Sequence, residues 1–248
     1  MKRKIAKKLA QRKRKIRKRL DKRSLPEEPR PMLNPGRIQY EIADRTRGIT
    51  CGGIGAVQML VQKLGLDKAI DSRLRIFKLH NPYFESDHVL NIAYNILCDG
   101  DCLEDIEKLR NDETYLDAVG AERIPDPTTA GDFCRRFSSE HVEILQDIIN
   151  DIRLKVWAQQ DPAFFKEAVI DADGTIAPTT GECKEGMDIS YQGLWGYHPL
   201  LVSLSNTGEP LYLCNRSGNC TSSKDAARYL DRAAAVCLKE GRRLIVVP

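Results

Sequence analysis

The hydrophobic pattern of this chain changes near Phe165, and that change limits the folds available to it. Between residues 49 and 160, apolar side chains recur at the three- and four-residue spacing of amphipathic helices. After Phe165 they form short apolar or alternating runs that are typical of strands. This order predicts an α+β protein, with an N-terminal all-helical region followed by a domain that contains a sheet.

The helical region contains several segments with clear boundaries. The spacing across Ile54–Leu64 predicts a helix that Gly65 ends. Thr129, with Asp132 three residues later, has the spacing of a capping box and predicts the start of a helix that continues through Phe137. Further helices are expected at 89–97, 103–109 and 142–156.

The C-terminal region reads as strands with one helix among them. Residues 206–208, Asn-Thr-Gly, predict a hairpin turn, and residues 222–241 predict a helix that Ser222 caps. Three antiparallel strands followed by a crossover helix and a further strand begin a ribonuclease-H-like sheet, so we expect that topology. Strands are expected at 168–173, 197–205, 210–215 and 243–247.

Positive charge is concentrated at the N-terminus. Residues 1–23 contain 14 of the 39 Lys and Arg residues and one acid, which leaves 25 basic against 34 acidic residues in the remainder. Such an arm displaces counterions from a polyanion and favours nucleic-acid binding without base reading. Its Ile and Leu residues recur at helical spacing, so we expect a frayed chain in isolation and an amphipathic helix once the charge is neutralised. The candidate DNA-binding residues of this arm are Lys13, Arg14, Lys15, Arg17 and Lys18.

Composition divides the chain into three predicted regions. Four prolines within 24–36 indicate a linker. We therefore expect a basic arm and linker at 1–37, a helical DNA-binding region at 38–163 and a sheet-containing domain at 164–248. No apolar run approaches the ~20 residues that span a bilayer, and no apolar segment of a signal peptide follows the arm. We expect a cytoplasmic, nucleoid-associated protein with no membrane partner.

Two carboxylates follow an apolar run in the first expected strand. Asp171 and Asp173 are two residues apart, and side chains with that spacing leave the same face of a strand. Paired carboxylates at a strand end can hold Mg²⁺, which prefers oxygen ligands. The same acids could instead cap a turn before Pro178 as structural groups, since structural networks also gather carboxylates.

The order and spacing of several short stretches resemble a DDE transposase of bacterial insertion sequences, over roughly residues 38–248. The resemblance implies DNA transposition by metal-dependent phosphoryl transfer, with a helical DNA-binding region and a ribonuclease-H-like catalytic domain. In that family, an Asp on the first strand, an Asp after the fourth strand and a Glu on a later helix bind two Mg²⁺ or Mn²⁺ ions. The resembling stretches are Ala43–Thr50, Asp105–Asp112, Asp126–Thr129, Phe133–Phe137, Asp171–Thr175, Tyr197–Leu200 and Asn215–Asn219.

The resemblance assigns Asp173 to the first catalytic and metal-binding acid, because it directly precedes a small residue and Thr. Asp171 is the second candidate ligand. The family's second Asp would be expected within a few residues of Pro248, and the Glu far beyond it; neither position lies in this sequence. The resemblance thus implies a truncated or frameshifted copy, or the first half of one, with an incomplete ribonuclease-H-like domain. We expect this chain alone to hold no two-metal site and to catalyse no strand transfer.

Three arginines outside the arm are candidate DNA contacts. Arg135 and Arg136 would suit a helix-turn-helix in the major groove, or would form a surface pair on a helix whose aromatic residues face the core. Arg216 could bind phosphate oxygens with its guanidinium, or form a salt bridge with a nearby acid. Trp157 and Trp195 are expected to pack in the core or at its rim rather than stack on bases.

Three functions remain open on these observations. The first is a catalytically incomplete transposase that still binds the ends of its element. The second is a non-catalytic regulator that occupies those ends, or inhibits full-length transposase by pairing with it. The third is an RNA- or ribosome-associated protein recruited by the basic arm. The expected partners under the first two are DNA and either another copy of the chain or full-length transposase.

Overall fold

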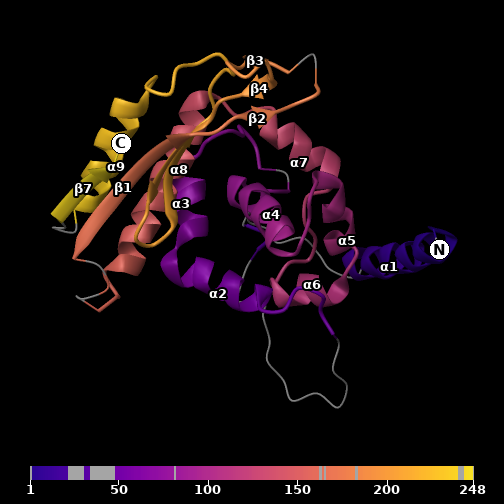
Figure 1. Cartoon of the computed structure of the whole chain (residues 1–248). Coiled ribbons are helices and arrows are strands. Elements are labelled where there is room, and N and C mark those ends of the chain that lie inside the picture. Colours follow the sequence, from indigo (N-terminus) through magenta and orange to yellow (C-terminus); the bar gives the residue numbers. More distant parts are fainter. Residues whose placement is uncertain are drawn as a thin grey trace. The chain divides into compact units, whose positions relative to one another are not determined.

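The computed structural model describes residues 2–21, 31–33, 48–80, 82–161, 164, 166–181, 184–239 and 243–247. Most of the expected linker at 24–36 lies outside the described residues, as do positions 43–47. The chain divides into two compact units, Met1–Ile148 and Ile149–Pro248. Helices and strands are both present, which confirms the α+β class (Figure 1). No helix among the described residues is long and apolar enough to cross a membrane.

The first unit is built from helices that enclose two hydrophobic clusters. One cluster surrounds Tyr94 and Leu116, and the other contains Ile70, Phe133 and Ile148. The helices expected from 54–64, 89–97, 103–109 and 142–156 are confirmed. The elements of this unit are α1 (Lys2–Asp21), α2 (Ile54–Leu64), α3 (Leu66–Arg73), α4 (Glu85–Leu97), η2 (Leu103–Asp105), α5 (Ile106–Arg110), α6 (Glu113–Ala118), α7 (Pro127–Cys134) and the N-terminal part of α8 (Ser139–Trp157).

The start of α7 differs from the predicted one. The Asp126 carboxylate accepts the backbone N–H of Thr129 at 3.0 Å and the Thr129 hydroxyl at 2.9 Å, so Asp126 is the cap. Pro127 occupies the first helical position, where its missing N–H costs nothing. The predicted cap at Thr129 is therefore wrong, because Thr129 already lies inside the helix. The predicted extension through Phe137 is also wrong, since α7 ends at Cys134.

The helix α1 packs on the first unit. Its Ile16 side chain is 7% exposed and belongs to the cluster around Tyr94. Arg12 and Arg19 form ion pairs with Asp112 and Asp117 at 3.6 and 2.9 Å. The acids of the unit therefore neutralise part of the arm, which is the condition under which we expected a helix.

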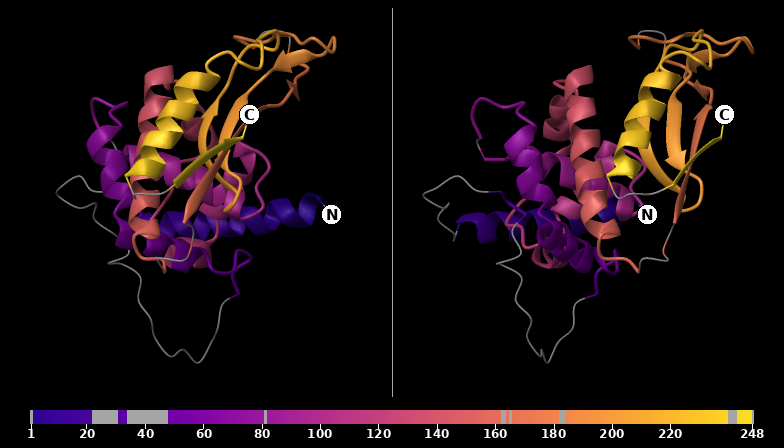
Figure 2. Two further views of the ribbon diagram at one scale, coloured as in Figure 1. Left: turned by 60° about the vertical axis from the view of Figure 1, so that its left-hand side comes forward. Right: turned by 90° about the vertical axis from the view of Figure 1, so that its left-hand side faces the viewer.

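The second unit is a four-stranded sheet with helices packed against it and a small three-stranded sheet at one end. In the larger sheet, of order β6-β5-β1-β7, β1 pairs antiparallel with β5 and parallel with β7. The helix α9 lies along one face, where Ala233 and Cys237 are buried in one cluster with Ala168 and Ile170 (Figure 2). The elements are the C-terminal part of α8, then β1 (Glu167–Gly174), β2 (Ala177–Pro178), β3 (Asp188–Ile189), β4 (Trp195–Tyr197), β5 (Leu200–Leu204), β6 (Glu209–Cys214), α9 (Ala226–Leu238) and β7 (Arg243–Val247).

The expected strand at 197–205 is two strands in different sheets. The break falls at His198-Pro199, and Pro199 has no N–H to donate to a ladder. The strand β4 pairs with β2 and β3, whereas β5 joins the larger sheet. The turn at 206–208 is confirmed, with Gly208 at a φ of 70° and its N–H bonded to the Leu204 carbonyl at 2.7 Å.

The helix α9 begins later than predicted. It starts at Ala226 after Asp225, which has a φ of 61°, so Ser222 is not its cap. The Ser222 carbonyl instead accepts a hydrogen bond from Arg216 at 3.1 Å, which keeps that segment out of the helix. The predicted helix end at Gly241 lies outside the described residues.

Two adjacent buried side chains in α4 have opposite pKa shifts. Asp87 is 1% exposed and accepts the backbone N–H groups of Met32 and Leu33 at 2.7 and 3.1 Å. Burial raises the pKa of Asp87 to about 7. His88 is 2% exposed and stacks on Phe133 with ring centroids 4.5 Å apart, and burial lowers the pKa of His88 to about 4.

These shifts predict opposite pH dependences. Between the ordinary value of 3.8 and about 7, Asp87 binds more protons in the folded than in the unfolded state, so its contribution to the free energy of unfolding falls as pH rises. Between about 4 and 6.5, His88 binds fewer protons in the folded state, so its contribution rises.

We expect Asp87→Asn to become more stable as pH rises from about 4 to 6.5, because the opposing contribution of Asp87 is removed and that of His88 is retained. His88→Phe keeps an aromatic ring and should become less stable up to about pH 7. Thermal denaturation at a series of pH values measures both trends. Each unit of difference between the folded and unfolded pKa changes the free energy of unfolding by about 1.4 kcal/mol. Parallel pH profiles for the two variants would contradict this account.

Candidate active site

The end of β1 presents two carboxylates on one face of the sheet. Ala168 and Ile170 point into the core, so Asp171 and Asp173 leave the opposite face, as their spacing predicts. Asp171 is half-buried and Asp173 is exposed. Their side chains are therefore accessible from outside the unit.

The C-terminal strand of the described chain lies beside these acids. In the parallel ladder, Asp171 is paired with Val247, and on the antiparallel side Asp173 is paired with Leu201. The carboxyl ends of β1 and β7 consequently meet at the same edge of the sheet. Side chains near that edge of either strand can approach one ligand.

The carboxylates of Asp171 and Asp173 provide some of the oxygen ligands that a hard cation needs. Two carboxylates can supply oxygens to one Mg²⁺ or Mn²⁺ ion that keeps several waters. Within the described residues, no group of three or more His, Cys, Asp and Glu side chains could hold a metal ion.

Gly174 follows Asp173 because no side chain fits at this position. A Cβ there would lie 2.6 Å from His198 Nε2 and 2.9 Å from Arg216 Nη2. Both neighbours are buried, at 3% and 5% exposure. The glycine thus lets two buried side chains contact the backbone immediately behind Asp173.

Arg216 and His198 connect three segments of the second unit. Arg216 Nε donates to the His198 carbonyl at 2.9 Å, and the His198 N–H donates to the Arg216 carbonyl at 2.9 Å. His198 Nδ1 bonds to the Cys220 carbonyl at 2.9 Å, so this nitrogen carries the proton. Arg216 Nη1 donates to carbonyls in the segment before α9, and Nη2 has no hydrogen-bond partner among the described residues. The structure therefore places the candidate phosphate contact Arg216 inside the unit.

The other two candidate arginines lie at the C-terminal end of α7. Arg135 and Arg136 are both exposed. Arg135 forms an ion pair with Asp132, and the Arg136 guanidinium lies 5.4 Å from the centroid of the Phe77 ring. Arg136 also borders a cavity of about 270 Å³ whose lining includes His88.

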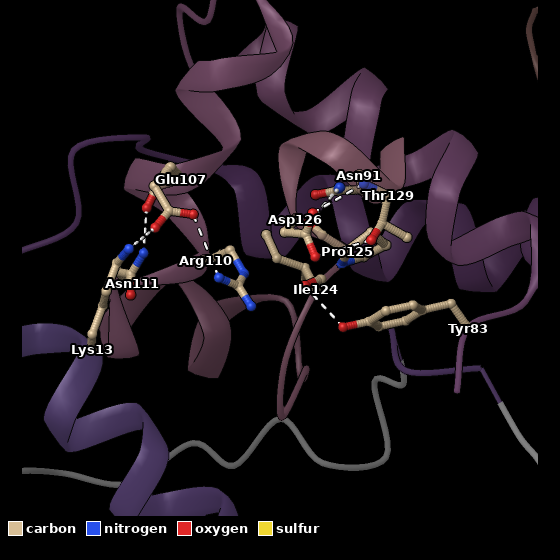
Figure 3. A network of polar contacts seen from close by, with 10 residues as sticks. All are labelled: Lys13, Tyr83, Asn91, Glu107, Arg110, Asn111, Ile124, Pro125, Asp126 and Thr129. Carbon is tan, nitrogen blue, oxygen red and sulfur yellow. Dashed lines mark hydrogen bonds and ion pairs between the residues drawn. The ribbon is translucent and has the colours of Figure 1, made fainter. Parts of the chain in front are cut away.

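The structure divides the candidate residues of the arm. Lys13 forms an ion pair with Glu107, in a network that includes Arg110 and Asn111 (Figure 3). Arg14, Lys15, Arg17 and Lys18 are exposed and form no ion pair with any described residue.

The same view shows how the Asp126–Thr129 stretch is held. Tyr83 donates its hydroxyl to the Ile124 carbonyl at 3.1 Å, and Asn91 donates to the Pro125 carbonyl at 3.2 Å (Figure 3). With the cap at Asp126, these bonds give the stretch a structural role in positioning α7.

One of the two tryptophans expected in the core or at its rim is more exposed than the sequence predicts. Trp157 is buried in the core, as expected, but Trp195 is 53% exposed. It lies in β4, opposite Ile189 of β3. These strands are too short for a hydrophobic period to show which side chains face the core, and only Gly193 in the turn between them marks the hairpin.

Comparison with known proteins identifies one family. The family described as transposase DDE domain group 1 matches residues 48–246, which is more than half of the chain and includes parts of both units. No curated protein and no solved structure matches the chain significantly.

The packing at the end of β1 generates a test. Gly174→Ala should destabilise the protein by about 1–3 kcal/mol, since the added methyl group displaces two buried side chains. Gly52→Ala is the matched control, because a Cβ at Gly52 meets nothing within 4 Å. Chemical denaturation of the two variants compares the costs, and equal stability would contradict the proposed packing.

Proposed function

Because the chain belongs to the transposase DDE domain family, we propose that it is part of the transposition machinery of a bacterial insertion sequence, and that its second unit begins a ribonuclease-H-like catalytic domain. The sheet order β6-β5-β1-β7 supports this proposal. Three antiparallel strands, a crossover helix and a parallel strand beside the first are the arrangement expected for such a sheet.

Asp173 is the first metal-binding acid in this proposal, and Asp171 assists it. The single observation that carries the assignment is the place of Asp173, exposed at the carboxyl end of β1 and on the same face as Asp171. Burial of that side chain in the core would have excluded it. His198 and Arg216 act as positioning residues, since they hold the backbone behind Asp173 without touching the DNA.

These residues alone do not carry out strand transfer in this proposal. Two ions around one phosphate need more carboxylate oxygens than Asp171 and Asp173 supply. No His, Cys, Asp or Glu among the described residues joins these two acids in a group that could hold a metal ion. The missing acids would come from polypeptide beyond the residues present here, or from another product.

The arm binds DNA through one side of α1. Ile16 faces the unit, and Arg12, Lys13 and Arg19 lie within about 60° of it around the helix, at about 100° per residue. Those three side chains form ion pairs with acids of the first unit.

The outward side of α1 carries the remaining candidates. Arg14 and Lys18 lie on the side opposite Ile16, with Lys15 and Arg17 flanking them. We therefore assign phosphate contacts to the outward residues and a structural role to Lys13. Arg135 and Arg136, exposed at the end of α7, are the second candidate contact.

A cleavage assay tests the catalytic part of the proposal. The purified chain, Mg²⁺ or Mn²⁺ and labelled ends of the element that encodes it should give a specific gel shift without cleavage. Asp173→Asn should bind those ends equally well, because the carboxylate is not a DNA contact. Metal-dependent cleavage that Asp173→Asn abolishes would show that the centre is complete. Specific binding without cleavage would also be the behaviour of a transposition regulator.

A second test separates the two sides of α1. Arg14→Ala combined with Lys18→Ala should weaken DNA binding and reduce the slope of log K against log salt by roughly 2, since each lost phosphate contact contributes about 0.9. Arg19→Ala, which removes an inward ion pair, should lower the melting temperature slightly and leave the slope unchanged. Equal changes in slope for the double variant and for Arg19→Ala would contradict the assignment of DNA contacts to the outward side of α1.

A further inference from the structure

The β3–β4 hairpin presents large apolar side chains to solvent. Tyr191 is 80% exposed and Trp195 is 53% exposed, while Ile189 and Leu194 are each 44% exposed. Ile189 and Trp195 are paired in the register, so their side chains leave the same face of the hairpin. The other tryptophan of the chain, Trp157, is 3% exposed. The hairpin therefore carries several large apolar side chains that remain exposed in the folded chain.

The tip of the hairpin has a defined conformation. Ser190 is 4% exposed and donates its N–H to the Leu194 carbonyl at 2.8 Å, while its hydroxyl accepts the Leu194 N–H at 3.2 Å. Gly193, at a φ of 75°, donates to the Ser190 carbonyl at 2.9 Å. Because the hydrogen bonds already fix the backbone of this turn, the aromatic side chain of Tyr191 loses little conformational entropy when it binds a ligand.

The base of the hairpin is packed tightly on its neighbours. A Cβ at Gly196 would lie 2.2 Å from the Ala177 carbonyl oxygen, and one at Gly218 would lie 2.3 Å from the Asp188 carbonyl oxygen. The Asn219 side chain also donates to the Asp188 carboxylate. The hairpin is thus attached rigidly to β2 and to the loop after β6.

This attachment places the hairpin at the carboxyl end of β1, the end that carries Asp173 (Figure 1). The strand β2 starts three residues after Gly174 and pairs with β4. A cation is also close: Lys184 Nζ donates to Thr179 Oγ1 at 2.7 Å, and the Thr179 N–H donates to the Trp195 carbonyl at 3.0 Å. The edge therefore combines carboxylates, aromatic rings and a lysine.

We propose that this hairpin binds unpaired DNA bases, with Tyr191 and Trp195 as the stacking residues and Lys184 as a contact to the phosphate backbone. The inference rests on the proposed function, which brings DNA to Asp173. Exposed aromatic rings beside a cation are the arrangement by which proteins hold single strands, because every base offers a π-face. In a duplex these faces are covered by neighbouring base pairs, so the hairpin selects frayed or single-stranded DNA over intact duplex.

The two tryptophans allow a direct test with the whole chain. Trp195 is exposed and Trp157 is buried, so stacking should quench the emission of Trp195 and leave that of Trp157. Titration with single-stranded oligothymidine should quench the emission, whereas a blunt duplex of equal length should quench it much less. Trp195→Leu should abolish the quenching and weaken single-strand binding roughly tenfold, the order expected for one lost stacked base.

Two further variants control the experiment. Trp195→Phe keeps a ring and should retain most of the affinity, which separates stacking from loss of folding. Leu213→Ala removes an apolar side chain that is 54% exposed on β6, and should change neither binding nor quenching.

Three results would overturn the proposal. In the first, the wild-type chain shifts single-stranded DNA in a gel but its tryptophan emission does not change, and Trp195→Leu binds that DNA with normal affinity. This result would exclude the stacking role and would leave DNA binding by the arm intact. A loss of self-association in Trp195→Leu, measured by sedimentation, with unchanged DNA affinity would make the hairpin a contact between copies. Absence of any DNA binding by the wild-type chain would remove the proposed function together with this inference.

Discussion

The close approach of two buried side chains to Gly174 is the constraint on which the second unit depends. The imidazole of His198 and the guanidinium of Arg216 occupy the space that a side chain at this position would fill. The Arg216 guanidinium donates to the His198 carbonyl, and the His198 N–H donates in return to the Arg216 carbonyl. The same guanidinium holds the segment before α9 through its carbonyls. Three stretches that are far apart in the sequence thereby converge at the end of β1.

Several features of the site follow from this convergence. The backbone at Asp173 has a fixed position although its side chain is exposed, which suits a carboxylate that must meet a ligand in one geometry. The break at Pro199 directs β4 away from the larger sheet and toward β2. The β3–β4 hairpin consequently extends from the edge where the acids lie. Burial of a guanidinium that meets mainly backbone carbonyls is costly, and here it fixes the strand end that carries the proposed metal-binding acids.

In the first unit, the positive charge of the N-terminal helix α1 is partly neutralised by ion pairs. Acids of α5 and α6, together with the acid that precedes α6, neutralise the cations beside Ile16. The cations on the other side of α1 remain exposed. Ion pairs of partly exposed side chains are each worth about 1 kcal/mol or less, so the packing of Ile16 is as important as the charges for holding the helix.

The sequence predicted the features that depend on local periodicity. The spacing of apolar residues located α2 and its end at Gly65, and the two-residue spacing placed Asp171 and Asp173 on one face. Features that depend on the contacts of the folded chain were not predictable. Asp126 and Thr129 both have the chemistry of a cap, and only the hydrogen bonds of the folded chain distinguish them.

The same limit applies to Arg216, Trp195 and the inward side of α1. The carbonyl partners of Arg216 come from separate segments, so its burial is invisible in the local pattern. The strands of the hairpin are two and three residues long, too short to reveal which way Trp195 points. The acids that pair with α1 lie about 90 or more residues away in the chain.

The central claim is that the face carrying Asp171 and Asp173 is the divalent-cation site of a DDE transposase domain. Paramagnetic broadening of backbone amide NMR signals by Mn²⁺ tests it most directly. The account predicts saturable broadening centred on Asp171–Gly174, reaching the paired residues of β5 and β7, and lost in Asp173→Asn. Broadening centred elsewhere, or unchanged in Asp173→Asn, would contradict it.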